Sequence, residues 1–130
     1  MTKAWVWVAP DVVAAIHDRQ LAEHGGGAGL RDAGLLSSAL ARPENTAAYG
    51  VPDAADLAAA YAFGIAKNHP FVDGNKRTAW VVARLFLRLN GAALTFPSVE
   101  AISAVEDLAA GKVGEAELAG WFRARIVPAG

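Results

Sequence analysis

The spacing of apolar and polar positions along the chain predicts mostly helices. Over residues 10–24, apolar side chains recur three and four positions apart, with a proline in the first turn and glycines 25–27 after the last. A second helix is predicted over residues 32–41 because Pro43 disfavours its continuation. Asp53 can cap a third helix of about fourteen residues, which brings Leu57, Tyr61 and Ile65 to one side. The first half of the chain therefore predicts three helices.

The second half continues the pattern. A helix is predicted from Gly74 or Asn75 to Asn90-Gly91, and it should be the central, most buried helix because residues 78–89 are apolar nearly all round. The remaining predicted elements are an extended Trp5–Val8, a surface loop Pro43–Pro52, a short strand Ala93–Phe96, and helices Pro97–Ala110 and Glu115–Arg125. The fold class predicted is all-α: a bundle of about six helices around a buried central helix, with minor short extended segments.

Composition narrows the class of protein. A chain of 130 residues with 54% apolar and 19% charged residues has the size and apolar content of one domain, residues 1–130. It has no cysteine, which excludes disulfides, zinc–thiolate sites and thiol nucleophiles. Its longest helix-compatible uncharged apolar run, Leu57–Ala66, is about half of the roughly 20 residues that cross a bilayer. We therefore expect a soluble cytoplasmic protein.

Charge is balanced overall but not locally. Twelve Lys and Arg against thirteen Asp and Glu give a net charge of -1, which argues against a general binder of nucleic acid or anionic membranes. Residues 67–88, however, contain five basic residues and a single acidic residue, Asp73, which gives this segment a net charge of +4. Arg77, Arg84 and Arg88 fall close to one face of the predicted helix. Any anion binding is therefore expected in this segment.

The segment His69–Ala79 carries the densest chemistry. A turn through Gly74 and Asn75 that leads directly into a helix points unpaired backbone N–H groups at one spot, where the helix dipole favours an anion. Lys76 adds a point charge and Arg77 a bidentate fork suited to phosphate oxygens. The segment predicts a pocket for a polyphosphate.

Two further residues supply reactive groups. The Asp73 carboxylate can hold magnesium that is itself bound to phosphates, and the His69 imidazole can take a proton from an attacking hydroxyl. Singly, a histidine before proline is often a helix cap and Asp-Gly-Asn is a common turn. Their joint occurrence with paired cations at the start of an apolar helix favours a functional site.

The same residues resemble the Fic/Doc family, whose motif is His-x-Phe-x-Asp/Glu-Gly-Asn-Gly/Lys-Arg. The match is complete from His69 to Arg77 in its Lys form, and the flanking Leu36–Pro43 and Leu85–Gly91 are similar to the Doc (death-on-curing) toxin branch. AMP-transferring Fic proteins carry Gly in place of Lys76 and a second Arg in place of Trp80.

The resemblance implies a role for each site residue. His69 would be the base and Asp73 the magnesium ligand, while Gly74, Asn75, Lys76 and Arg77 would bind the phosphates of ATP. The segment Pro43–Pro52 corresponds to the place where the family holds its target, so the resemblance also implies target contacts by Asn45, Thr46 and Tyr49.

The resemblance further implies a bacterial type II toxin that uses ATP and Mg²⁺ to phosphorylate a threonine of elongation factor Tu. Inhibition would come in trans from a Phd-like antitoxin, whose amphipathic helix would lie in an apolar groove. Three alternatives stay open at this point: an AMP transferase, a ribonuclease toxin, and a degenerate module that only binds antitoxin or target. Near the motif there is no broad basic face or base-stacking aromatic side chain, which argues against the ribonuclease.

Overall fold

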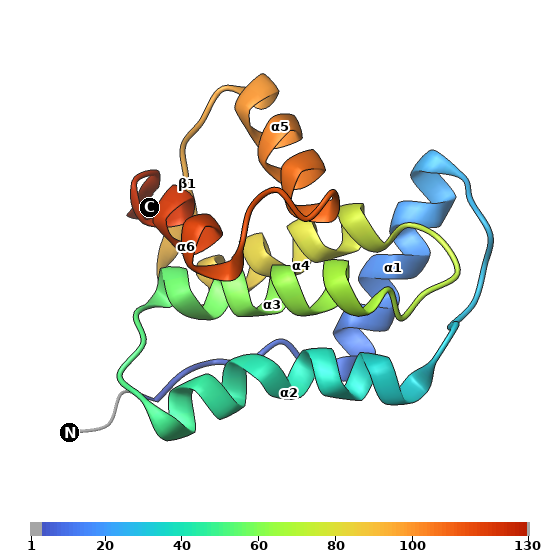
Figure 1. Ribbon diagram of the computed structural model, residues 1–130, viewed down its shortest axis with the longest axis horizontal. Coiled ribbons are helices and arrows are strands. Elements are labelled where there is room, and N and C mark those ends of the chain that lie inside the picture. Colours follow the sequence, from blue (N-terminus) through green and yellow to red (C-terminus); the bar gives the residue numbers. More distant parts are fainter. Residues whose placement is uncertain (1–3, 130) are drawn as a thin grey trace.

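The computed structural model describes residues 4–129 and shows six helices and a two-stranded sheet among them (Figure 1). The predicted all-α bundle is confirmed. The elements are α1 Pro10–His24, α2 Ala33–Tyr49, α3 Ala54–Asn68, α4 Asn75–Leu89, β1 Ala92–Leu94, α5 Ser98–Ala109, α6 Glu115–Arg123 and β2 Ile126–Pro128. No helix in the described part of the chain is both long and apolar enough to cross a membrane.

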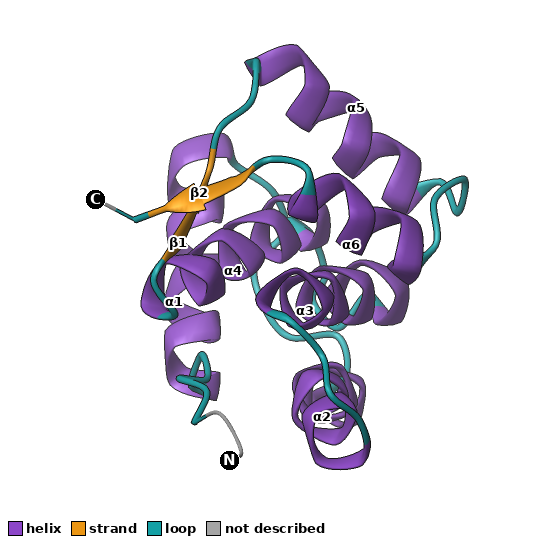
Figure 2. Cartoon of the chain, turned by 90° about the vertical axis from the view of Figure 1, so that its left-hand side faces the viewer, coloured by secondary structure: helices purple, strands orange, loops and turns teal. Residues whose placement is uncertain are grey.

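The central helix is α3, not α4 as the sequence pattern predicted. Ten of the 15 residues of α3 are buried, against seven of 15 in α4. Viewed nearly end-on, α3 lies between α2, α4 and α6, with which it makes its main contacts (Figure 2). Its many alanines explain the difference, because small side chains let helices pack closely on every side. The predicted buried helix of residues 75–89 instead exposes Lys76, Arg84 and Arg88 along one side.

Helix α2 is longer than predicted, so the expected surface loop Pro43–Pro52 was wrong. The helix passes through Pro43 and ends at Tyr49. A proline inside a helix removes the hydrogen bond to the carbonyl four residues earlier, here that of Ala39. That carbonyl packs against Gly64 of α3, and the ring of Pro43 is fully buried. The helix thus continues through Pro43 where α2 packs closely on α3, which a local reading of Pro43 cannot foresee.

The close approach of α2 and α3 predicts opposite effects for two glycine-to-alanine changes. A Cβ at Gly64 would lie 3.1 Å from the Ala39 carbonyl oxygen, whereas one at Gly120, inside α6, would meet nothing within 4 Å. We expect Gly120→Ala to stabilise the fold by up to about 1 kcal/mol through helix propensity. Gly64→Ala should destabilise it by about 1 kcal/mol or more through overpacking against backbone. Urea unfolding of both variants measures the difference, and equal stabilisation by the two would contradict the packing.

As predicted, Asp53 caps the start of α3, where it forms a capping box with Asp56. The Asp53 carboxylate also accepts a hydrogen bond of 2.7 Å from Arg123 of α6. This guanidinium, together with the capping N–H, lowers the pKa of Asp53 from 3.8 to about 2. The ionised cap therefore links the central helix to α6.

The lowered pKa predicts acid sensitivity. Because the pKa of Asp53 is lower in the folded protein than in the unfolded chain, its stabilisation is present above about pH 4 and is lost as the pH falls through about 2. Both side chains are about half exposed, so screening limits the effect to about 1 kcal/mol. Asp53→Asn keeps a good N-cap without the charge. Urea unfolding between pH 2 and 6 should show a smaller fall in stability for this variant than for the parent.

The segments that precede α1 and follow α6 both contact the end of α4 that lies far from the motif, where Ala129 N donates to Gly91 O at 3.0 Å. Residues 4–9 run outside helices and strands, and the amide side chain of Asn90 bonds both Val6 N and Val6 O, at 2.9 Å each. The predicted strand near Ala93 is β1, which pairs antiparallel with β2, a strand that the sequence pattern did not indicate. The predicted last helix correspondingly ends at Arg123 instead of Arg125.

Candidate functional site

The motif lies in the turn that joins α3 to α4. His69 ends α3 in the left-handed region, with φ of 53°. Gly74, with φ of 77°, precedes the first residue of α4. The connector between α1 and α2 runs beside this turn, because Val72 N donates to Gly29 O at 3.0 Å and Arg31 N donates to Pro70 O at 2.7 Å. The site is thus built from the α3–α4 turn and, beside it, the α1–α2 connector, two segments that are far apart in sequence.

The buried amide of Asn75 holds the turn closed. Its Oδ1 accepts from Phe71 N at 3.0 Å, and its Nδ2 donates to Phe71 O at 2.9 Å. The same Nδ2 lies 3.1 Å from His69 Nδ1. These bonds make Asn75 the structural centre of the turn, whereas the sequence suggested a place in the turn and a phosphate contact but not these hydrogen bonds.

The contact with Asn75 also decides where the proton of His69 lies. Because the amide nitrogen is a donor, Nδ1 of His69 accepts, and the neutral ring carries its proton on Nε2. The ring is exposed at the mouth of the turn. Taking a proton at Nε2 therefore requires the other tautomer, in which the ring leaves the contact with Asn75.

Asp73 presents an ionised carboxylate at the same turn. Its Oδ1 accepts from Gly74 N at 2.9 Å and its Oδ2 from Gly27 N at 3.4 Å. The N–H of Gly74, followed by that of Gly27, lowers the pKa of Asp73 below its ordinary value. The side chain is exposed, and the bond to Oδ2 is long. One carboxylate oxygen is thus available to a cation.

The start of α4 combines free backbone N–H groups with two cationic side chains. Gly74 supplies no side-chain cap, so the first-turn N–H groups point outward without intrahelical partners. Lys76 Nζ lies 3.4 Å from Glu106 of α5. Arg77 makes one long contact of 3.4 Å with Gly25 O, and its buried Nε has no hydrogen-bond partner within the described chain. A partly buried guanidinium with unused donors is suited to receive phosphate oxygens.

A pocket of about 290 Å³ opens beside these cations, between α4 and α5. It is lined by Lys76, Arg77, Trp80, Ala101, Ile102, Val105 and Glu106. Cations at one edge and apolar side chains behind them match a ligand with a charged and an apolar part.

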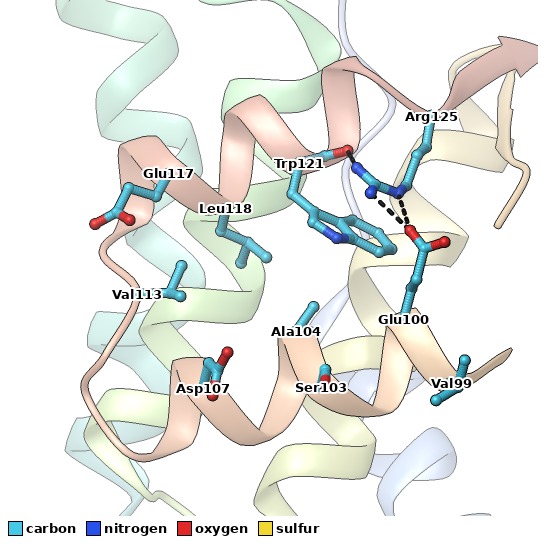
Figure 3. Close-up of a pocket in the computed structure, with 10 residues that line it drawn as sticks. All are labelled: Val99, Glu100, Ser103, Ala104, Asp107, Val113, Glu117, Leu118, Trp121 and Arg125. Atoms are coloured by element: carbon cyan, nitrogen blue, oxygen red, sulfur yellow. Dashed lines mark hydrogen bonds and ion pairs between the residues drawn. The ribbon is translucent and has the colours of Figure 1, made fainter. Parts of the chain in front are cut away.

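A second pocket, of about 440 Å³, lies between α5 and α6 and contains no residue of the motif (Figure 3). There Arg125 pairs with Glu100 at 2.7 Å and stacks on Trp121 at 4.1 Å. The chemistry of the motif, and not pocket size, thus identifies the candidate site.

The structure brings together some of the residues that the sequence singled out and separates others. His69, Asp73, Gly74, Asn75, Lys76 and Arg77 all lie in the turn or on the first turn of α4. Asn45, Thr46 and Tyr49 lie 12 to 16 residues along α2 from its start beside the motif, which is about 18–24 Å of helix. Contact of these three with a target stays a prediction without support from their placement. Arg84 and Arg88 lie away from the turn, near Leu94.

Sequence reasoning missed Arg31 and His17. Arg31 donates from Nε to His69 O at 2.7 Å and from Nη2 to Asn68 O at 2.8 Å, so it caps the end of α3. His17 of α1 lies under the turn. Neither position has a local signal beyond its charge or aromaticity, although His17 shares the buried face of α1 with Val13, four residues earlier.

Comparison with known proteins identifies the family of this chain. The sequence model of the Fic/DOC family matches residues 7–87, more than half of the chain. The chain belongs to the Fic/DOC family. Its match to "Toxin Doc" of Mycolicibacterium smegmatis is 52% identical over 73 residues, covering 54% of this chain and 55% of that protein. "Protein kinase doc" of Escherichia phage P1 is 32% identical over 117 residues, covering 89% and 92%. The aligned part thus spans about half of the first relative and nearly all of the second.

Proposed function

We propose that this protein is a toxin of the Doc type that transfers the terminal phosphate of ATP to a hydroxyl group of a protein. The observation that carries the proposal is the complete motif from His69 to Arg77 in its Lys form at the start of α4. Family membership and the similarity to a protein named as a kinase over most of both chains support it. Phosphoryl transfer needs mainly positioning and charge stabilisation, and this site offers both.

Each residue has a role in the proposed reaction. The first-turn N–H groups of α4, with Lys76 and Arg77, bind the phosphate oxygens. Lys76 must leave Glu106 to do so, whereas the donors of Arg77 are already underused. His69 accepts the proton of the attacking hydroxyl once its ring turns from Asn75. Apolar side chains of the pocket between α4 and α5 would receive the uncharged part of the nucleotide.

The donor set also fits Mg²⁺. Magnesium in phosphate sites takes one or two carboxylates together with phosphate oxygens and water. Asp73 supplies one ionised carboxylate beside the anion site, and residues 4–129 hold no cluster of three His, Cys, Asp or Glu that would form an all-protein site. Bound there, the ion would neutralise charge on the phosphates.

The partners in this proposal follow from the family resemblance. The target would be elongation factor Tu, modified on a threonine, and the effect would be arrest of translation. The toxin would be one half of a bacterial type II toxin–antitoxin pair, neutralised in the cytoplasm by a Phd-like antitoxin that inserts an amphipathic helix into an apolar groove.

The experiment uses ATP labelled in either of two positions. The protein, Mg²⁺ and elongation factor Tu are incubated with γ- or α-labelled ATP, and the factor is weighed by mass spectrometry. Phosphoryl transfer adds about 80 Da and γ label, whereas AMP transfer adds about 329 Da and α label. The first result supports the kinase, and the second replaces it with an AMP transferase. An unmodified factor would remove it as the target, and a lysate with γ-labelled ATP then tests for any other acceptor protein.

A further inference from the structure

His17 is a buried histidine on α1 that packs directly beneath the motif turn. Only 3% of its surface is exposed. Its ring lies parallel to the ring of Phe71, with 3.8 Å between centroids and 9° between planes. Its Nε2 lies 2.8 Å from the backbone carbonyl oxygen of Asp73. One side chain of α1 thus contacts both the apolar anchor of the turn and its acidic residue.

The acceptor fixes the protonation of the ring nitrogen. A carbonyl oxygen can only accept, so Nε2 of His17 carries a proton and donates it. The other nitrogen, Nδ1, lies 4.0 Å from the exposed carboxylate of Asp18. The space is closed further by Gly74, where a Cβ would lie 3.6 Å from Cδ2 of His17. The ring therefore has little freedom, and it holds the Asp73 peptide in one orientation.

The peptide that His17 holds also binds the carboxylate, because its N–H is that of Gly74. Asp73 Oδ1 accepts a hydrogen bond from the N–H of the next residue, Gly74. Oδ2 lies at the edge of the site, where it makes the long contact with Gly27 N. A rotation of the Asp73–Gly74 peptide would turn Gly74 N away from Oδ1, which would release the carboxylate and alter the first turn of α4. Groups that orient a metal ligand commonly change metal affinity when they are removed.

We infer that His17 is a positioning residue, which fixes the Asp73 carboxylate for a metal–nucleotide complex through its hydrogen bond to the Asp73 carbonyl. The inference rests on the proposed function for the ligand, but the bond and the stacking that it uses are independent of which phosphate is transferred. It also gives a reason for a histidine at a buried position, where an apolar side chain would donate nothing.

Three variants separate the donor from the packing. His17→Phe keeps an aromatic ring on Phe71 but removes the donor, whereas His17→Gln keeps a donor of similar reach without the ring. His24→Phe, on the exposed end of the same helix, is the matched control. Calorimetry measures the Kd of the ATP analogue AMP-PNP with Mg²⁺ and with EDTA for each folded variant. Hydrogen exchange follows the Gly74 amide, which bonds to Asp73 Oδ1.

Positioning predicts a loss confined to metal-dependent binding. His17→Phe should weaken binding of AMP-PNP by about 10- to 100-fold with Mg²⁺ but little with EDTA. Its Gly74 amide should exchange faster. His17→Gln should recover most of both properties, and His24→Phe should match the parent.

Parent-like binding with Mg²⁺ by His17→Phe, or an equal loss with EDTA, would overturn the inference. If His17→Phe does not fold, His17→Gln provides the test. A purely packing role predicts that His17→Gln also loses the Mg²⁺-dependent binding of AMP-PNP, whereas positioning predicts that it keeps most of it. If the parent itself binds no AMP-PNP, the proposed function fails. The exchange of the Gly74 amide then tests His17 alone, and unchanged exchange in the variants rejects it.

Discussion

Replacement of His69 by asparagine is expected to lower the rate of phosphoryl transfer by about 10²- to 10⁴-fold, the usual contribution of a general base. Asparagine is chosen because position 69 has a positive φ of 53°, which asparagine tolerates better than most residues. The side chain is exposed, so its loss removes little packing. Its amide oxygen can also accept from Asn75 in place of Nδ1. The fold should therefore persist while proton transfer is lost.

The rate is measured in single turnovers with γ-labelled ATP, and growth arrest on expression gives a second readout. His24→Asn, which changes an exposed histidine outside the motif, should leave both unchanged. A His69→Asn protein that stays folded and transfers phosphate at the parental rate would show that another group removes the proton. Toxicity without transfer would instead favour a module that acts by binding alone.

Local signals in the sequence predicted α1 and the start of α3 well. Pro10 and the glycines after His24 mark the two ends of α1, and Asp53 marks the start of α3, because caps and prolines act on the nearest few residues. The same reasoning failed at Pro43, where the outcome depends on Gly64 of another helix. Local rules describe the backbone correctly only where no distant packing competes with them.

The candidate site shows the same division. The chemistry of the turn is contiguous in sequence, so His69, Asp73 and Arg77 could be singled out from the chain alone. Their supports are not contiguous: His17 is 56 residues before Asp73, and Arg31 is 38 before His69. Sequence spacing carries no information on such contacts. The order of burial between α3 and α4 could not be predicted either, because an alanine-rich helix does not stand out by hydrophobicity.

The second large effect is expected at Asn75, whose hydrogen bonds to Phe71 the sequence did not indicate. Asn75→Ala removes the partners of both Phe71 N and Phe71 O, which are buried. An unpaired buried backbone group costs about 1–3 kcal/mol, so the free energy of unfolding should fall by about 2–4 kcal/mol. Urea unfolding measures this loss. Asn45→Ala, at an exposed position of α2, is the matched control and should change stability little.

Asn75→Asp tests whether the loss comes from the hydrogen bonds and not from the missing side-chain volume. The carboxylate can still accept from Phe71 N, but it has no N–H for Phe71 O and faces that carbonyl with a negative charge. We therefore expect it to destabilise the fold although its shape matches that of asparagine. A loss below about 1 kcal/mol in both variants would mean that water replaces the amide in the turn. A large loss in both would show that the hydrogen bonds of Asn75 to Phe71 stabilise the turn that carries His69 and Asp73.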